Sequence, residues 1–232
     1  MKKTIKKTGF VVIASLLAGL LAAQPVFQQQ SLIYKNSFTN LQPEEWVIET
    51  QKAVPAKVFV ENGAMVIDAA KDATVWLNKK LSGNILIDCY REVVMKEGAH
   101  DRLSDMNFFW MANDPANTNL FTRKGLFKEY DSLRLYYAGI GGNTNTTTRF
   151  RKYTGDGNKK VLTEYTDTPH LLQPNHQYHI QILIHDGLTE CWLDNQLYFS
   201  YRDPDPIRSG YFGFRTTKSR QMISQLKIYQ LK

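Results

Sequence analysis

Cysteine is scarce in this chain of 232 residues, and the motifs of several common enzyme classes are missing. There are two cysteines, Cys89 and Cys191, and no C-x-x-C, H-E-x-x-H, P-loop or G-x-S-x-G pattern. Zinc, nucleotide and serine-hydrolase chemistry therefore has no support in the sequence. Each cysteine continues an apolar-alternating run, as buried free thiols commonly do, so we predict that the two do not form a disulfide.

Long apolar runs are also missing, apart from one near the start. Residues 1–23 combine a basic beginning, the apolar stretch VVIASLLAGLL and two alanines, a pattern typical of a secretory signal peptide. The stretch is shorter than the roughly 20 residues of a membrane-spanning helix. We expect cleavage near Ala23, export to the periplasm or the medium, and no membrane insertion of residues 24–232.

The positive charge becomes small once that segment is set apart. The formal net charge is +7, but residues 1–23 hold four lysines and no acid, which leaves +3 for residues 24–232. Such a weak excess does not indicate a nucleic-acid partner. A local excess of positive charge remains from Arg123 to Tyr153, where the sequence has seven Lys or Arg residues and only two acidic ones, Glu129 and Asp131.

No segment shows a long helical period. Instead, short runs with alternating apolar residues recur between turn signals, among them AKVFVENGAMVIDA, MNFFWMA, SLRLYYAGI, TTTRFRKY, HQYHIQILIHDG and GYFGFRTT. Many short strands at such spacing are typical of a β-sandwich or barrel. We predict one all-β domain over residues 24–232, an antiparallel two-sheet sandwich, because all-β domains reach about 200–250 residues.

Alternation divides three of these runs into two faces. We expect the core faces to carry Met106, Phe108, Trp110, Leu133, Leu135, Tyr137, Thr148 and Phe150. The opposite faces would then display Asp105, Asn107, Phe109, Arg134, Tyr136, Asn145, Arg149, Arg151 and Tyr153. Gathered on one sheet, such planar donors suit carboxylates and sugar hydroxyls. The alternative is a solvated outer face whose arginines keep the protein soluble.

Two further clusters of titratable residues stand in loops. In HDRLSDMN, His100 is the best candidate for proton transfer, and its alternative is a loop histidine hydrogen bonded to Asp101 or Asp105. In RDPDP, Asp203 and Asp205 allow a structural calcium ion, although prolines beside aspartates are more typical of a rigid turn. We expect no other metal or cofactor.

The hairpin TECWLDNQLYFSY followed by GYFGFRTT resembles the end of concanavalin-like and laminin-G-like jelly rolls. The segments HDRLSDMNFFWMANDP, YDSLRLYYAGIGGNTNTTTRFRKY and GYFGFRTTKS resemble a family of secreted concanavalin-like domains of poorly defined function from Gram-negative polysaccharide degraders. More distantly, the chain is similar to jelly-roll polysaccharide lyases. This resemblance implies a jelly-roll fold and a role connected with polysaccharides, but it assigns no role to any residue.

Three functions follow, and the leading hypothesis is a lyase that cleaves a uronic-acid glycan of the pectic or rhamnogalacturonan kind by β-elimination. Its catalytic candidates are His100, Tyr136, Arg149 and Arg151, and its substrate-binding candidates are Asp105, Asn107, Phe109, Arg134, Asn143, Asn145 and Tyr153. The alternative is a non-catalytic glycan-binding module that uses the same face. A glycoside hydrolase comes third, because no convincing carboxylate pair is visible. A lyase needs the His100 loop over the arginine face, whereas a binding module does not.

Overall fold

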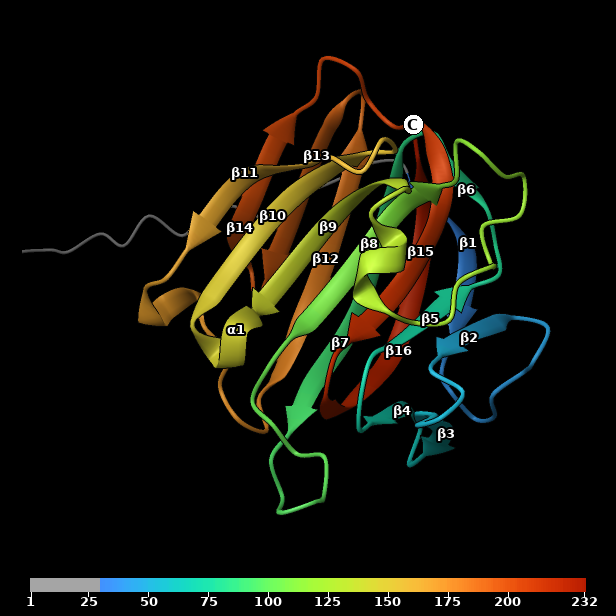
Figure 1. Ribbon diagram of the computed structural model, residues 1–232. Helices are drawn as coiled ribbons and strands as arrows, with labels where there is room; N and C mark the ends of the chain where they lie inside the picture. The colour runs from blue at the N-terminus through green and yellow to red at the C-terminus, as the bar shows by residue number, and fades with distance from the viewer. Residues whose placement is uncertain (1–29) are drawn as a thin grey trace, which may run out of the picture.

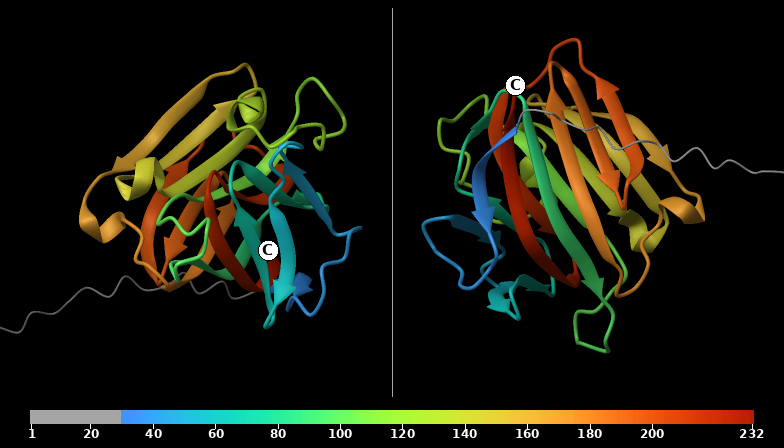
Figure 2. Two further views of the ribbon diagram at one scale, coloured as in Figure 1. Left: turned by 60° about the horizontal axis from the view of Figure 1, so that its bottom comes forward. Right: turned by 180° about the vertical axis from the view of Figure 1, so that it is seen from behind.

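Two antiparallel sheets packed face to face form the protein, as Figure 1 and the two turned views of Figure 2 show. The computed structural model describes residues 30–232, so the expected signal peptide of residues 1–23 lies outside the described residues. Each sheet has eight strands, and every pairing is antiparallel. The predicted antiparallel β-sandwich is confirmed.

The first sheet contains, in spatial order, β14 (Gln196–Arg202), β13 (Leu188–Leu193), β12 (Gln177–His185), β7 (Ile85–Val94), β16 (Ser219–Leu231), β4 (Ala64–Ala69) and β3 (Lys57–Glu61), with β1 (Gln30–Asn36) also paired to β16. The second sheet contains β11 (Lys159–Tyr165), β10 (Thr147–Thr154), β9 (Arg134–Gly141), β8 (Met106–Asn113), β15 (Ser209–Thr216), β5 (Ala73–Leu77) and β2 (Trp46–Thr50), with β6 (Leu81–Ser82) paired to β15. Neighbouring strands are often distant in sequence, so the sheets close only when the whole domain folds.

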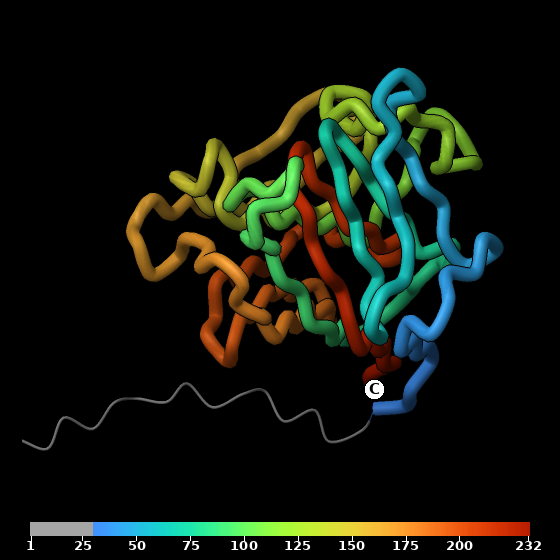
Figure 3. Tube along the Cα trace, turned by 90° about the horizontal axis from the view of Figure 1, so that it is seen from below, coloured from blue at the N-terminus to red at the C-terminus, as the bar shows by residue number. Residues whose placement is uncertain are grey.

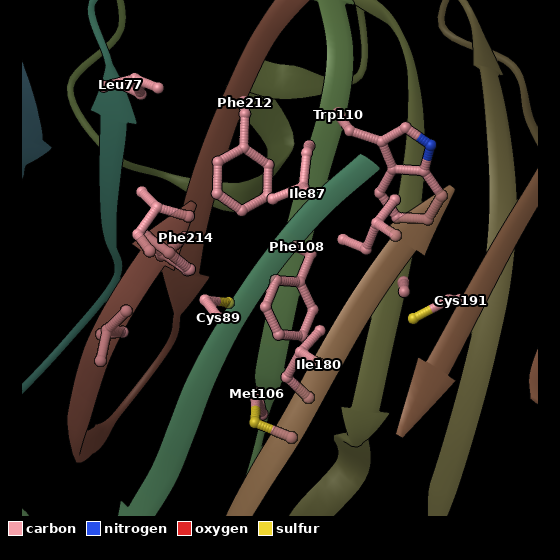
Figure 4. Close-up of a cluster of buried hydrophobic side chains, with 14 of the residues drawn as sticks. Leu77, Ile87, Cys89, Met106, Phe108, Trp110, Ile180, Cys191, Phe212 and Phe214 are labelled. Carbon is pink, nitrogen blue, oxygen red and sulfur yellow. The ribbon is translucent and has the colours of Figure 1, made fainter. Parts of the chain in front are cut away.

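Figure 3 shows the backbone of the two layers from below. The hydrophobic core lies between the two sheets. In Figure 4, Phe108 and Trp110 of β8 and Phe214 of β15 face Ile87 of β7 and Ile180 of β12. Alternation explains this arrangement, since residues at every second position of a strand point to the same face. Cys89 and Cys191 belong to the same core as free thiols.

Helical segments are few and short in residues 30–232. They are the 3-10 helices η1 (Phe127–Tyr130) and η2 (Thr168–His170) and the single turn α1 (Gly142–Asn145) between β9 and β10. None of the helices in residues 30–232 has the length and apolar character of a membrane span.

Candidate functional site

The outer face of the second sheet is divided into a covered half and an open half. Residues 114–133 run from β8 to β9 and cross over the sheet in front of β8 and β15 (Figure 1). The segment and the sheet together form a second apolar group, here named the outer cluster, whose buried members are Trp76, Phe109, Ala112, Leu120, Tyr130, Leu133, Leu135, Tyr137 and Tyr153. The candidate site is in the half of the face that this segment leaves open.

That open half holds a cleft of about 290 Å³, here named the outer-face cleft. It is lined by Arg102, Ser104, Asp105, Asn107, Phe127, Tyr137, Gly139, Gly142, Asn143, Thr144, Thr147, Arg149, Arg151 and Thr217. Five residues predicted for the site are among them, namely Asp105, Asn107, Asn143, Arg149 and Arg151. Their gathering in one cleft is a feature of the structure, and their role in binding stays a prediction.

The floor of the cleft is built from the middle of β8 and β9. The Tyr137 hydroxyl donates a hydrogen bond of 3.0 Å to Oδ1 of Asn107 on the neighbouring strand. The Tyr137 ring leans over Gly139, two residues further along the same face, and a Cβ at position 139 would overlap that hydroxyl. Glycine is therefore required at position 139 for the tyrosine to lie along the floor.

Asp105 fixes the orientation of the floor amide. Its Oδ2 accepts a hydrogen bond of 2.8 Å from Nδ2 of Asn107, and its Oδ1 accepts one of 2.8 Å from Arg102. The Thr217 backbone N–H also points at this carboxylate. Burial raises the pKa of Asp105, although the Thr217 and Asn107 donors and the Arg102 charge oppose the rise. One N–H of Asn107 and the lone pairs of Tyr137 remain available to a ligand.

The three arginines of the cleft differ in what neutralises them. Arg102 forms an ion pair with Asp105, and Arg149 forms one with Glu164 of β11. Arg151 has no carboxylate partner among the described residues; its guanidinium lies over the Tyr137 ring, 5.6 Å from the ring centre. Its Nε is buried without a hydrogen-bond partner. Because Arg151 lines the cleft and forms no ion pair among residues 30–232, its terminal N–H donors are the ones best suited to bind an anion here.

The turn α1 forms the rim of the cleft with an unusual backbone. Asn143, Thr144 and Asn145 have φ values of 53°, 60° and 57° in succession. Left-handed geometry is accessible to asparagine but disfavoured for a β-branched threonine. The side chain of Asn145 does not reach the cleft; it holds the backbone of Leu172 with hydrogen bonds of 2.8 and 3.0 Å. Asn145 is thus an anchor of the rim.

His100, the candidate for proton transfer, does not lie over the arginine face, where the lyase hypothesis needs it. Its Nδ1 is 2.7 Å from Oδ1 of Asp68 on β4, a strand of the first sheet. The neighbouring Asp101 pairs with Arg220 of β16, also in the first sheet. The loop after β7 is therefore drawn toward the first sheet, and the histidine does not line the outer-face cleft.

Strand β9 presents its side chains in the opposite sense from the prediction. Tyr136 points into the sandwich core, packs 5.9 Å from Trp110 and donates a hydrogen bond of 2.5 Å to buried Asp203. Arg134, on the same side, pairs with Asp205 at 2.6 Å and does not line the cleft. The prediction failed because the outer side of β9 is apolar as well: Leu135 and Tyr137 belong to the outer cluster, so the strand does not alternate between a polar and an apolar face.

Phe109 and Tyr153, two of the substrate-binding candidates, lie on the predicted face of the sheet, but they are not exposed. Both are completely buried in the outer cluster, where Phe109 stacks on Trp76 at 5.5 Å. Burial raises the pKa of Tyr153 to about 12. These rings support segment 114–133, and a ligand in the cleft does not reach their faces.

The side chains around Asp203 and Asp205 do not favour the calcium ion that the sequence allows at these positions. The Asp203 carboxylate is occupied by the Lys152 ammonium at 2.7 Å and by the Tyr136 hydroxyl. Within residues 30–232, no group of three or more His, Cys, Asp or Glu side chains is placed to hold a metal ion. The side chains around Asp203 fit a protein ion pair in the core.

Sequence reasoning missed several residues that line the cleft. Tyr137 had been assigned to the sandwich core, and Arg102, Phe127, Gly139 and Thr217 had no assigned role. The spacing of Tyr137 and Gly139 was the available signal, because a glycine two positions after a tyrosine on one face leaves room for the ring. Phe127 and Thr217 come from distant loops, and local patterns do not reveal them.

The sequence matches one family model, and it does so over residues 67–226. That family is described as "Domain of unknown function (DUF6250)". A search of curated proteins gives no significant match.

Solved structures share the fold at low sequence identity. A protein of unknown function with a galectin-like fold from Bacillus subtilis has a TM-score of 0.71 at 14% identity, over 86% of this chain and 96% of that chain. An endo-β-1,3-glucanase from Pyrococcus furiosus has a TM-score of 0.64 at 9% identity, over 88% and 95%. The carbohydrate-binding module CBM66 from Bacillus subtilis has a TM-score of 0.56 at 13% identity, over 80% and 96%. These likenesses show the fold alone.

Proposed function

Since the chain belongs to the DUF6250 family, whose description assigns no activity, its function has to be inferred from its own residues, and we propose that it binds an acidic glycan in the outer-face cleft without cleaving it. The observation that carries the proposal is the state of Arg151. It is a cation that lines a cleft, its buried Nε has no hydrogen-bond partner, and it forms no ion pair with a carboxylate of residues 30–232.

The groups around Arg151 suit a sugar that carries a carboxylate. A guanidinium binds a carboxylate through two parallel N–H donors, while the free N–H of Asn107 and the oxygen of Tyr137 match sugar hydroxyls. The remaining lining is polar as well, with Ser104 and Thr147 among its residues. Glycan-related proteins with the same fold, a carbohydrate-binding module and a β-1,3-glucanase, support a glycan as the ligand.

Binding is favoured over elimination because the cleft has no suitable base. His100 and Tyr136, the candidates for proton abstraction, both lie outside it. Tyr137 does line the cleft, but burial raises its pKa well above the ordinary value, so it stays protonated at neutral pH. A lyase needs a group that takes the proton beside the carboxylate.

Hydrolysis is disfavoured by the number of carboxylates. Glycosidases commonly use two, about 5 Å apart in retaining enzymes and farther apart in inverting ones. Asp105 is the single carboxylate among the lining residues of the cleft, and it is engaged by Arg102 and Asn107. Glu129 and Asp131 do not line it; Asp131 pairs instead with Lys159.

We also propose that the protein is exported to the periplasm or the medium, where it would meet polymeric glycans. The basic and apolar pattern of residues 1–23 supports this. Cell fractionation combined with mass determination of the N-terminus tests it, and an intact N-terminus in the cytoplasm would contradict it.

The test of glycan binding is a titration of the purified protein with polygalacturonate, alginate and glucuronan, with a neutral β-glucan as control. We expect binding of at least one acidic polymer and its loss in Arg151→Ala. The matched control is Arg134→Ala, which removes an arginine outside the cleft and should bind as the wild type does. Unsaturated, ultraviolet-absorbing products would show a lyase instead, and absence of binding to all three acidic polymers would overturn the proposal.

A further inference from the structure

We infer that the outer-face cleft accepts a single sugar unit, at the end or at a branch of a glycan, and does not hold the middle of an extended chain. The inference rests on the proposed function and concerns the same cleft. It follows from what closes the cleft on each side.

One wall is the edge of segment 114–133, represented by Phe127. The Phe127 ring is held from below by Arg215, whose guanidinium carbon is 4.6 Å from the ring centre, and it lies 5.7 Å from Tyr137. Arg215 is itself buried and donates hydrogen bonds to the backbone oxygen of Gly125 and the hydroxyl of Thr74. This wall is fixed by groups beneath it, and a chain cannot continue over the covered half of the sheet at floor level.

Ion pairs close the two sides that lie across the strands. On the β11 side, Arg149 and Glu164 face each other as directly paired residues of β10 and β11. On the β15 side, Arg102 spans from Asp105 to the backbone oxygen of Lys218, with bonds of 2.8 Å to each. A glycan chain that ran across the strands would have to break these contacts or pass above them, away from the floor of the cleft.

The fourth side is the rim α1, which the hydrogen bonds between Asn145 and Leu172 hold in place. The cleft between these four sides has a volume of about 290 Å³ and opens toward the solvent above the sheet. A terminal sugar ring can enter it from above, whereas a glycan chain that lies along the floor meets a wall in each direction.

The experiment uses the acidic polymer that binds best in the panel above and its purified oligomers. Affinities are measured by calorimetry for the monosaccharide, dimer, tetramer and hexamer. We expect a change of less than about threefold from dimer to hexamer, because units beyond the first make few new contacts. In parallel, the polymer is partly hydrolysed, and the protein bound per unit mass should rise in proportion to the number of chain ends.

Two results would overturn the inference while leaving the proposed function intact: affinity that climbs steadily with oligomer length, or bound protein that follows polymer mass and not the number of ends. If no oligomer and no polymer binds, the proposed function fails and the inference fails with it. Arg151→Ala serves as the control that the measured binding occurs in the cleft, and it should abolish the signal across the whole oligomer series.

Discussion

Adjacent residues of β10 perform different tasks because alternate side chains point to opposite faces of the sheet. Phe150 is fully buried in the sandwich core, stacked between Trp110 and Phe199 at 5.6 and 5.3 Å. Arg151, the next residue, lines the cleft on the other face. Phe150 thus contributes to stability and Arg151 to the cleft. Substituting each residue in turn can separate an effect on folding from an effect on ligand binding.

We predict that Phe150→Ala lowers the free energy of unfolding by about 3–5 kcal/mol, the usual cost of removing a buried phenyl ring. Arg151→Ala should cost about 1 kcal/mol or less, since it removes a partly exposed contact with the Tyr137 ring. Urea unfolding of both variants measures the difference. If the arginine variant unfolds as easily as the phenylalanine variant, Arg151 is a structural residue and the site has been misassigned.

Gly139 is a second position where one atom decides the shape of the cleft. A Cβ added there would overlap the Tyr137 ring and approach Oδ1 of Asn107 at 2.9 Å. We predict that Gly139→Ala destabilises the protein by about 1–3 kcal/mol through overpacking, and that it weakens glycan binding because the floor must shift.

Gly142→Ala is the matched control for Gly139→Ala. Gly142 also lines the cleft, but a Cβ there would stand 3.3 Å from the Thr147 hydroxyl, a contact that a small movement relieves. Thermal unfolding and calorimetric titration of the two variants provide the comparison. Equal effects of the two substitutions would show that the tyrosine does not define the floor.

At the scale of elements, segment 114–133 is tied to the sheet through a buried carboxylate. Glu49 of β2 accepts hydrogen bonds from Nε1 of Trp76 and the hydroxyl of Tyr130, each at 2.8 Å, and from the backbone N–H of Arg123 at 2.9 Å. Two of these donors, Arg123 and Tyr130, belong to the segment. Its attachment therefore depends on the protonation state of Glu49.

Burial raises the pKa of Glu49 above the ordinary value of 4.5, and the three donors and the Arg123 charge only partly offset this. The folded protein consequently binds this proton more tightly than an opened form, so the attachment strengthens as the pH falls from above the raised pKa toward about 4.5. We predict stronger amide protection of residues 114–133 near pH 5 than near pH 7.5, after correction for intrinsic exchange rates.

Glu49→Gln is the control, because glutamine does not ionise and should remove most of the pH dependence in hydrogen-exchange mass spectrometry. Its amide cannot accept all three hydrogen bonds, so protection should also be lower at both pH values. Greater protection of the wild-type segment at neutral pH would contradict the assigned direction of the pKa shift.

The same segment explains which strands the sequence predicted correctly. The faces of Phe108 on β8 and of Phe150 on β10 were predicted correctly, because each strand alternates core side chains with the polar ones of the cleft. On β9 the alternation is lost, since Tyr136 meets the sandwich core and Tyr137 meets the outer cluster. Periodicity identifies a strand, but it assigns faces only when one of them is polar.

For the molecule as a whole, the sequence predicted the architecture better than the site. Two-sheet packing follows from many short alternating runs, whatever their exact partners. The cleft depends on which loops meet, and its walls at Arg102, Phe127 and Thr217 come from three separate connections. His100 was misplaced for the same reason, because its position is decided by Asp68 on the other sheet. Such long-range contacts have no local signature in the chain.

Strand order also decides the state of the two cysteines. Cys89 on β7 pairs with Ile180 of β12, and Cys191 on β13 pairs with Ile182 of the same strand. One whole strand therefore separates them. Two interstrand spacings of about 4.8 Å, combined with an offset of two residues along β12 of about 7 Å, place their backbones roughly 12 Å apart. A disulfide requires Cα atoms closer than about 7 Å, so the sandwich would have to rearrange to form one.

We therefore predict that no disulfide forms under oxidising conditions. The melting temperature should then be equal in the presence and absence of a reductant. Burial raises the pKa of Cys191 to about 12 and that of Cys89 further, so both thiols should resist alkylation in the folded state. After denaturation without reductant, mass spectrometry should find two labels per chain. A mass lower by two hydrogens with no label would show a bridge, and the order of β7, β12 and β13 would then be wrong.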